Sequence, residues 1–389
     1  MAGSITGAGS GFVFWLIAAR LYSSADVGIA SAVISALRLV TMLSILGLDI
    51  GVIRYLAHER DRNGMLNTCL TIVLLASLLF ASVFLAGLDI WSPSLADLLD
   101  QGLMIPFVIF AAAMSLSNFL GQGAFVAFRN TRHSFIQNLV SLIRIGILPL
   151  LVAFSAFGIF LSFGIGMVAA FAVGLVLLGR YAYKPRFAIK RRVVNDMIHY
   201  SAGNYMARIF EYLPNFVLPI MVVNMLGAEE NAYFFIAWAT AMFLLMIPRT
   251  TSMSLLAEGS YVRDELRKNV IRSLKFIFIL LIPAVLGIVL FGDFILGFFG
   301  SEYSDNAFDM LRVLALACIP FSLNSVYATV KRVQKDVWQV ICVYGGIAVV
   351  TLVAGYVLMG EFGLIGVGYA WVVGNGVVSI GIGVRMVQR

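Results

Sequence analysis

Charged residues are scarce in this sequence. Only 12% of its 389 residues are Asp, Glu, Lys or Arg, whereas 61% are hydrophobic. A soluble globular domain carries about 25% charged residues, so a chain with so few charges could not cover its apolar surface in water. The composition excludes a soluble fold and indicates that lipid solvates part of the chain.

Cysteine and histidine are also rare, with three residues of each type. The cysteines are scattered in or beside apolar runs, which fits neither a disulfide framework nor a metal site. The histidines lie at the edges of different runs, so we expect no metal or nucleophile cluster. These residues are Cys69, Cys318, Cys342, His58, His133 and His199.

Nucleotide-binding and export signals are missing as well. The sequence has no G-x-x-x-x-G-K-[ST] phosphate loop, so neither ATP hydrolysis nor a cofactor is expected. Its first residues, MAGSITGAGSGFVFWLIAAR, lack the basic start and the cleavage site of a signal peptide. We interpret them as a first membrane helix.

Long apolar runs are what the sequence has in abundance. A helix of roughly 20 apolar residues spans a bilayer, and only helices or closed barrels satisfy their backbone groups in lipid. The runs are long and do not alternate, which favours helices. The sequence therefore predicts an all-α integral membrane protein with about twelve transmembrane helices. They lie near 3–20, 27–50, 67–88, 103–127, 136–156, 159–179, 199–224, 230–256, 270–292, 307–328, 336–358 and 363–384.

The loops between these runs alternate in charge. Basic loops near residues 60, 130, 187, 265 and 333, together with a basic C-terminal tail, alternate with acidic ones. The positive-inside rule places the basic set in the cytoplasm. We expect a multi-pass protein of the cytoplasmic membrane with both termini inside, as an even helix count requires. The net charge of +7 then reflects topology and not a nucleic-acid partner.

The two halves of the chain resemble each other. Three pairs of segments match in order, at offsets of 203 to 205 residues. We predict two six-helix lobes related as parallel repeats, at 1–180 and 199–389, joined by a basic cytoplasmic linker at 181–198. Transporters use such repeats as lobes that rock about a site between them. The pairs are LYSSADVGIASAV and LGAEENAYFFIAW, RNTRHSF and RVQKDVW, and FGIFLSFGIG and FGLIGVGYAW.

The segment 212–260 carries the strongest family signal, an ordered series of LP, LG, AYFFIAW, IP and LLAEGS. Together with ARLYSSADVGIASAV and LGLDIGVIRYLA near the N-terminus, it resembles the polysaccharide (O-antigen, Wzx-type) flippases of the MATE/MurJ-like exporter superfamily. The resemblance implies two lobes around a V-shaped central cavity. It also implies ATP-independent export of a polyprenyl-pyrophosphate-linked oligosaccharide, with the glycosyltransferases and polymerase of the same pathway as partners.

Charges occur inside the membrane helix that begins SAGNYMARIFEYLPN (201–215). Asn204, Arg208, Glu211 and Asn215 share one helical face because they are spaced i, i+4, i+7 and i+11. An arginine at the bilayer centre costs about 2.5–3.5 kcal/mol on insertion scales. This face, flanked by Tyr205 and Tyr212, is therefore expected to meet protein or water, and not lipid.

Other membrane helices carry Arg38, Arg144 and Arg249. At about 1.5 Å per residue, Arg144, Arg208 and Arg249 lie roughly 12–13 Å from their helix ends. Glu211 is the one acidic residue expected at that depth. A surplus of arginine favours a cavity for an anionic headgroup, because the guanidinium fork binds phosphate through two hydrogen bonds. The structural alternative pairs Arg208 with Glu211 and leaves the other arginines bonded to carbonyls. Glu211 and Glu258 are the candidates for cation coupling.

Three other functions remain open. A MATE-type multidrug or cation antiporter needs an acidic cavity, which the arginine surplus disfavours. A membrane glycan polymerase or glycosyltransferase needs a large outer loop, whereas the longest candidates, near 89–102 and 293–306, are short. A structural scaffold has no need for charges at mid-depth.

Overall fold

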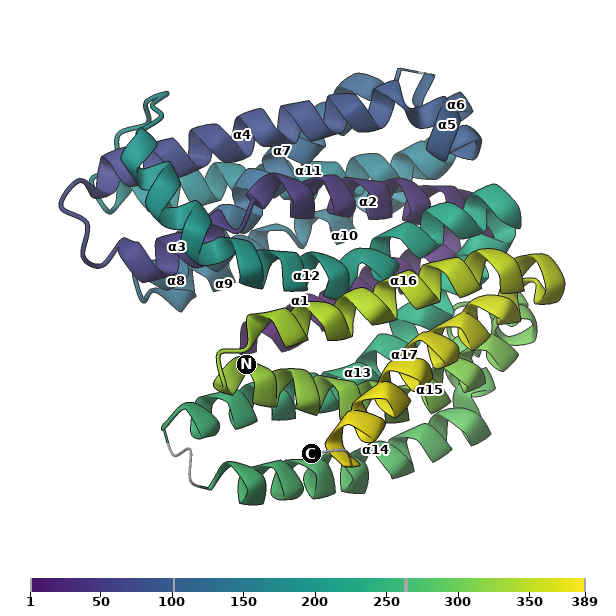
Figure 1. The fold of residues 1–389 in the computed structure, drawn as a ribbon. Coiled ribbons are helices and arrows are strands. Elements are labelled where there is room, and N and C mark those ends of the chain that lie inside the picture. Colours follow the sequence, from purple (N-terminus) through teal and green to yellow (C-terminus); the bar gives the residue numbers. More distant parts are fainter. Residues whose placement is uncertain (1, 101, 262–264, 388–389) are drawn as a thin grey trace. The chain divides into compact units, whose positions relative to one another are not determined.

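The computed structural model describes residues 2–100, 102–261 and 265–387. Over these residues the chain is nearly all helical and contains no strand (Figure 1). It divides into two compact units, Met1–Tyr205 and Met206–Arg389. The boundary falls inside the long helix α12, Arg191–Met225. The lobe limits 1–180 and 199–389 stay a prediction.

The first unit is built from helices that are often short or broken. α7 lies among α2, α4 and α11 and packs against all three. The elements are α1 Ala2–Leu21, α2 Ser24–Ile45, α3 Leu48–Tyr55, α4 Arg62–Ala86, α5 Leu88–Trp91, α6 Pro93–Asp100, α7 Met104–Asn118, the π-helical η1 Phe119–Ala124, α8 Phe125–Ala127, α9 Thr131–Val140, α10 Ile143–Ile147, the 3-10 helix η2 Leu148–Phe154, α11 Ser155–Gly179 and the start of α12.

The helix expected over 27–50 is broken, so that part of the prediction is wrong. α2 ends at Ile45, Leu46 and Gly47 are left-handed (φ 52° and 73°), and Asp49 belongs to the short α3. A Cβ at Gly47 would stand 3.0 Å from Tyr205 Cβ, so glycine permits the close approach of α12. The hydroxyl of Tyr205 donates to the carbonyls of Met42 and Leu43, which the end of α2 leaves without helical partners.

The apolar stretch Thr131–Gly179 covers two of the expected crossings. It has 49 residues, more than twice the roughly 20 that one crossing needs. The chain reverses at Ser155, whose φ is 51°. A Cβ at Gly158 would lie 2.1 Å from Leu151 O, which shows how closely α11 turns back on η2.

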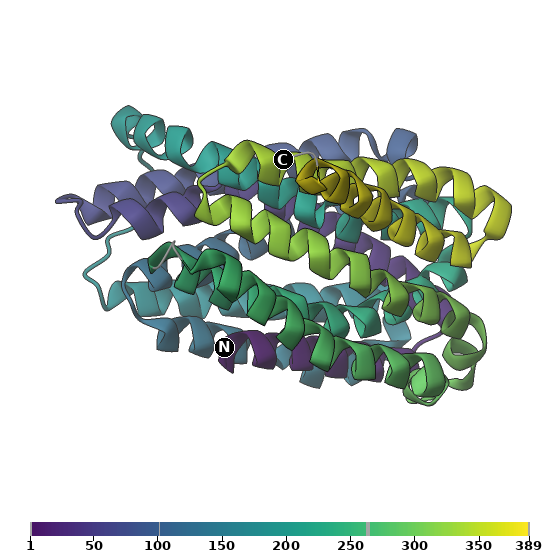
Figure 2. The same ribbon diagram turned by 60° about the horizontal axis from the view of Figure 1, so that its bottom comes forward.

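The second unit is more regular, with one continuous helix for each expected crossing. α15 lies at its centre and packs against α13, α14, α16 and α17, and α16 and α17 form an antiparallel hairpin (Figures 1 and 2). Its prolines lie inside helices that continue past them. The helices are α12 from Met206 onward, α13 Ala228–Tyr261, α14 Leu266–Gly297, α15 Ser301–Val333, α16 Val337–Phe362 and α17 Leu364–Val387.

Three smaller expectations need correction. Glu258, which we expected in a turn, lies in α13 because that helix continues to Tyr261. The outer loops near 89–102 and 293–306 are largely helical: α5 and α6 fill the first, and only Phe298–Gly300 separates α14 from α15 in the second. Residues 191–198 of the expected linker belong to α12.

This is a multi-pass membrane protein. Among the described residues, ten helical segments are long and apolar enough to span a bilayer, and Gly9–Leu21 of α1 is a shorter apolar helix. With Thr131–Gly179 counted as two crossings, the segments correspond to the twelve runs of the sequence.

Candidate functional site

The first unit holds two of the arginines expected in a binding cavity. Arg38 of α2 and Arg144 of α10 face the same aromatic ring, that of Phe163 in α11. Their guanidinium carbons lie 5.6 and 5.2 Å from its centroid, and that of Arg144 also lies 5.3 Å from the ring of Phe14. Such cation–π contacts partly offset the cost of removing the guanidinium groups from water.

A cavity of about 160 Å³ opens beside these two arginines. Its polar lining consists of hydroxyl and amide side chains in addition to the guanidinium groups. Arg144 is only 8% exposed, and its Nε has no hydrogen-bond partner among the described residues. No carboxylate from the part of the chain that the structure describes lines this cavity or pairs with either arginine. The neutral polar lining residues are Ser10, Ser117, Asn118, Asn138 and Ser141.

The second unit holds a different cluster, centred on Glu211 of α12. Oε1 of Glu211 lies 4.0 Å from Nε of Arg249 in α13, and Oε2 lies 3.4 Å from Nη2 of Arg332 in α15. The Glu211 side chain is only 14% exposed. With two arginines around one carboxylate, the cluster has a net charge of +1.

Aromatic rings hold both arginines of this cluster. The guanidinium carbon of Arg249 lies 5.4 Å from the ring of Tyr212 and 5.5 Å from that of Phe321. That of Arg332 lies 5.5 Å from the ring of Tyr344 in α16. The rings restrict how far the guanidinium groups can turn, so a ligand would meet them in a preset orientation.

These contacts correct the expectation that Arg249 has no acidic partner. Counting residues from a helix end gives the depth of a side chain but not which neighbour it faces, and Arg249 faces Glu211. The sequence does not mark Arg332 as a site residue, because the expected run 307–328 ends before it and Arg332 falls in a basic loop, whereas α15 continues to Val333. The spacing of Ser325, Thr329 and Arg332 (i, i+4, i+7) was the available signal for a polar face continuing along α15.

The other expected site residues have different surroundings. Asn215 Oδ1 accepts a hydrogen bond from Trp238 Nε1 at 3.2 Å, and Tyr205 is bonded to the end of α2. Asn204 and Arg208 are partly buried, and Glu258 is exposed near the end of α13. The structure thus groups Arg38 with Arg144, and Glu211 with Tyr212, Arg249 and Arg332. Among the described residues, no three His, Cys, Asp or Glu side chains are placed to hold a metal ion.

Residues 17–308 match the family described as "Polysaccharide biosynthesis protein". The chain belongs to this family. The chain is also 25% identical over 181 residues to the "Putative O-antigen transporter" of Shigella flexneri. That alignment covers 44% of this chain and 41% of the relative, so the chain spans about two fifths of that relative's length.

Solved structures share the fold of this chain. Lipid II flippase MurJ, in an inward closed conformation, superposes with a TM-score of 0.80 at 13% identity, over 97% of this chain and 85% of MurJ. An inward-facing MATE family multidrug transporter of the MOP superfamily superposes with a TM-score of 0.69 at 16% identity, over 93% and 92% of the two chains. The expected family resemblance and the MATE/MurJ-like helical fold are confirmed.

Proposed function

We propose that this protein is a secondary transporter, and not an enzyme, that flips a polyprenyl-pyrophosphate-linked oligosaccharide across the cytoplasmic membrane. The observation that carries the proposal is the pair Arg38 and Arg144, which lines a cavity without a carboxylate among the described residues. Buried charges are normally paired, so two guanidinium groups that line a cavity and have no carboxylate partner in the described part of the chain suit an anionic ligand. Membership of a polysaccharide biosynthesis family makes a glycan carrier the natural source of that anion.

The energetics of transport agree with an anionic substrate. A pyrophosphate carries about two negative charges, and its outward movement gains about 2.3 kcal/mol per charge per 100 mV when the cell interior is negative. The arginines need only lower the cost of holding the anion away from water. In this proposal the lobes 1–180 and 199–389 rock about a V-shaped central cavity, the linker at 181–198 and both termini are cytoplasmic, and the partners are glycosyltransferases and the polymerase of the pathway.

The surroundings of Glu211 disfavour a cation or multidrug antiporter. A carboxylate that binds a cationic substrate must be negative and accessible, whereas Glu211 lies between Arg249 and Arg332. Glu211 suits cation coupling better than Glu258, because its carboxylate contacts two arginines of the site whereas Glu258 is exposed near the end of α13. A glycan polymerase is disfavoured because neither expected outer loop is a large irregular region: Phe298–Gly300 alone separates α14 from α15, and α5 and α6 occupy 88–100.

The test removes the two arginines that have no acidic partner in the described structure. Arg38→Ala combined with Arg144→Ala should abolish surface glycan while the protein still reaches the membrane, and lipid-linked precursor should accumulate in the cytoplasmic leaflet. Lysine at both positions should restore export in part, because it returns the charge but not the bidentate fork. Arg312→Ala is the matched control, since Arg312 pairs with Asp309 on an exposed surface of α15.

Normal glycan export by the double alanine variant would refute the anionic cavity. Unchanged glycan together with loss of drug or cation efflux would support the antiporter instead.

A further inference from the structure

A segment outside the helices, residues 182–190, lies along helix α4 in the first unit, and we call it the strap. Side chains four residues apart on α4 bond to strap backbone groups two residues apart. Four helical residues rise about 6 Å and two extended residues about 6.6 Å, so the two repeats stay in register. The bonds are Asn63 Nδ2 to Ala182 O (3.2 Å), Lys184 N to Asn63 Oδ1 (3.3 Å), Asn67 Nδ2 to Lys184 O (2.9 Å), Arg186 N to Asn67 Oδ1 (2.9 Å) and Ala188 N to Thr71 Oγ1 (3.4 Å).

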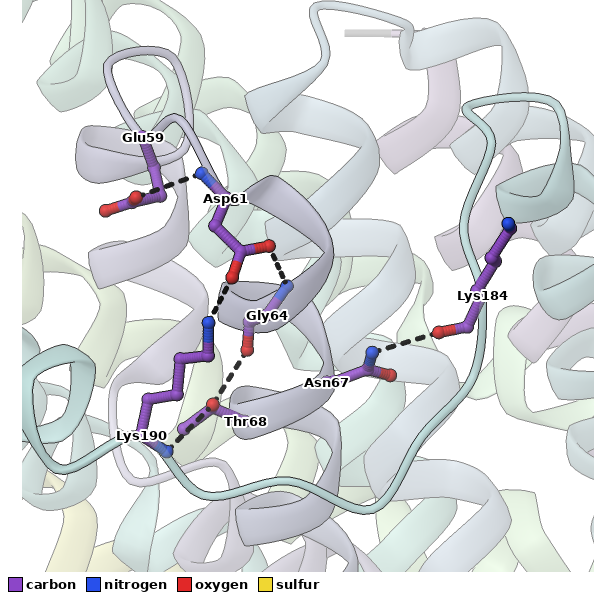
Figure 3. Close-up of polar contacts among 7 residues, drawn as sticks. All are labelled: Glu59, Asp61, Gly64, Asn67, Thr68, Lys184 and Lys190. Carbon is purple, nitrogen blue, oxygen red and sulfur yellow. Dashed lines mark hydrogen bonds and ion pairs between the residues drawn. The ribbon is translucent and has the colours of Figure 1, made fainter.

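The end of the strap is fastened at the start of α4 (Figure 3). Lys190 Nζ pairs with the carboxylate of Asp61, which also caps α4 by accepting from Gly64 N at 2.8 Å. Lys190 N donates to Thr68 Oγ1 at 3.2 Å. The strap is therefore a bound part of the first unit along its whole length.

A groove of about 220 Å³ lies between the strap and helices α4, α7 and α11. Apolar side chains dominate its lining, among them Leu74, Leu116, Phe171 and Leu175. Three uncharged polar side chains also line it, and all three are already bonded: Asn67 and Thr71 to the strap backbone, and Tyr183 through its hydroxyl to Asn67 Oδ1 at 2.6 Å. None of these three is left to recognise a sugar.

The groove lies where acyl chains are expected. Leu74 is twelve residues from the start of α4, or about 18 Å along the helix, against a hydrocarbon core of about 30 Å. The flanking apolar side chains are turned outward: Leu75 is 51% exposed, Val176 74% and Phe187 84%. An outward apolar surface in a membrane protein faces lipid, so an acyl chain can enter the groove from the bilayer.

The rim of the groove is positively charged. Arg186 lines it and Lys184 is two residues away on the strap; both side chains are exposed. Neither has a carboxylate partner within the described ranges of the chain. Basic pockets between membrane helices on the cytoplasmic side hold anionic headgroups, and the rim offers two cations for one phosphate.

We propose that this groove binds an anionic glycerophospholipid, with one acyl chain between α4, α7 and α11 and its phosphate at Lys184 and Arg186. The site is separate from the cavity at Arg38 and Arg144 and from the cluster around Glu211, and it does not depend on the flippase assignment. Its occupant is a membrane phospholipid and not the glycan carrier, because the described residues that line the groove leave no uncommitted polar group apart from its basic rim. The lipid fastens the strap to α4 from the bilayer side.

Native mass spectrometry of the purified full chain in detergent tests the proposal. Phosphatidylglycerol should be retained, and phosphatidylcholine should bind at least tenfold more weakly. Lys184→Glu combined with Arg186→Glu should weaken phosphatidylglycerol binding by roughly 25-fold or more, since each basic residue near an anionic surface contributes about a factor of five. Leu175→Trp should block the groove and weaken both lipids. Arg267→Glu, which reverses an exposed charge in the second unit, should leave the binding of both lipids unchanged.

Three results would overturn the site. Equal retention of the two phospholipids by the unmodified protein would show that the headgroup makes no specific contact. This measurement uses the unmodified protein and so does not depend on the folding of a variant. Unchanged phosphatidylglycerol binding in the double glutamate variant would place the lipid elsewhere. Tighter binding of polyprenyl phosphate than of phosphatidylglycerol, lost in Leu175→Trp, would assign the groove to the transport substrate.

Discussion

Asn67 should control how firmly the strap is held. Its side chain makes three hydrogen bonds to strap residues: Nδ2 donates to Lys184 O, and Oδ1 accepts from Arg186 N and from the hydroxyl of Tyr183. Burial raises the pKa of Tyr183 to about 12, so its hydroxyl stays protonated and remains a donor at neutral pH. Asn67→Leu keeps the size of the side chain and removes all three bonds.

The expected effect follows from the number of bonds and the exposure of their partners. Each hydrogen bond contributes about 0.5–1.5 kcal/mol net, which gives about 1.5–4.5 kcal/mol for three. Lys184 and Arg186 are exposed, so water can satisfy their freed backbone groups and the lower part of that range applies. A loss of about 1.5–3 kcal/mol raises the population of the released strap by roughly 10- to 150-fold.

Limited trypsin digestion measures that population. Trypsin does not cut before proline, so Lys184 is protected by Pro185, and the first cut in the strap is expected after Arg186. Cleavage follows the open fraction when the strap recloses faster than it is cut. The full-length band of Asn67→Leu should therefore disappear at least tenfold faster than that of the unmodified protein. The thermal midpoint of the rest of the fold should be unchanged.

The control is Ser77→Ala on the same helix, because the Ser77 hydroxyl bonds only to Leu74 O within α4 among the described residues. It should leave the cleavage rate unchanged. If Asn67→Leu and Ser77→Ala were cut equally slowly, the bonds of Asn67 would not be what holds the strap.

Three further predictions concern charge. Glu211→Gln leaves two arginines facing each other and should lower the free energy of unfolding by about 1–3 kcal/mol, measured as a lower thermal midpoint. Adding Arg332→Gln should partly restore the midpoint, and an unchanged midpoint in Glu211→Gln would contradict the cluster. Lys190, and then the Gly64 amide, hold the pKa of the Asp61 carboxyl below its ordinary value. The stability that this carboxylate adds is therefore complete above about pH 4 and is lost as the pH falls through the pKa of Asp61 in the folded state. Asp61→Asn preserves the helix cap but loses the ion pair with Lys190, so the strap amides should exchange hydrogen faster than in the unmodified protein. This difference in exchange rate should be constant from pH 6 to 8 and should disappear in acid. Single cysteines in the basic loops should resist an impermeant thiol reagent in intact cells, and labelling in the strap from outside would reverse the topology. The loop positions are near 60, 130, 187, 265 and 333.

Much of the fold could be read from the sequence because a bilayer imposes local rules. A segment in lipid must satisfy its own backbone hydrogen bonds and be about 20 residues long, so composition along the chain is enough to locate crossings. The six runs of the second half each became one helix, α12 to α17. The family signal in 212–260 is equally local, and it is confirmed by the match over 17–308.

Only the tertiary structure decided which polar groups meet. Depth along a helix is readable from residue counts, but the direction of a side chain around the helix and the identity of its neighbour are not. Residue counts therefore give Arg249 no acidic partner, whereas in the structure it lies beside Glu211. By sequence Arg332 falls in a basic loop, whereas α15 continues to Val333 and Arg332 contacts Glu211.

The strap is the clearest example of that limit. Asn63, Asn67 and Thr71 are common polar residues at the start of a membrane helix, and 182–190 reads as a basic linker. Their partners lie 117 to 121 residues apart in the chain. Hydrogen bonds at that separation depend on the tertiary packing that brings the strap beside α4, so the sequence determined where the membrane segments are, and packing alone determined what is bound to them.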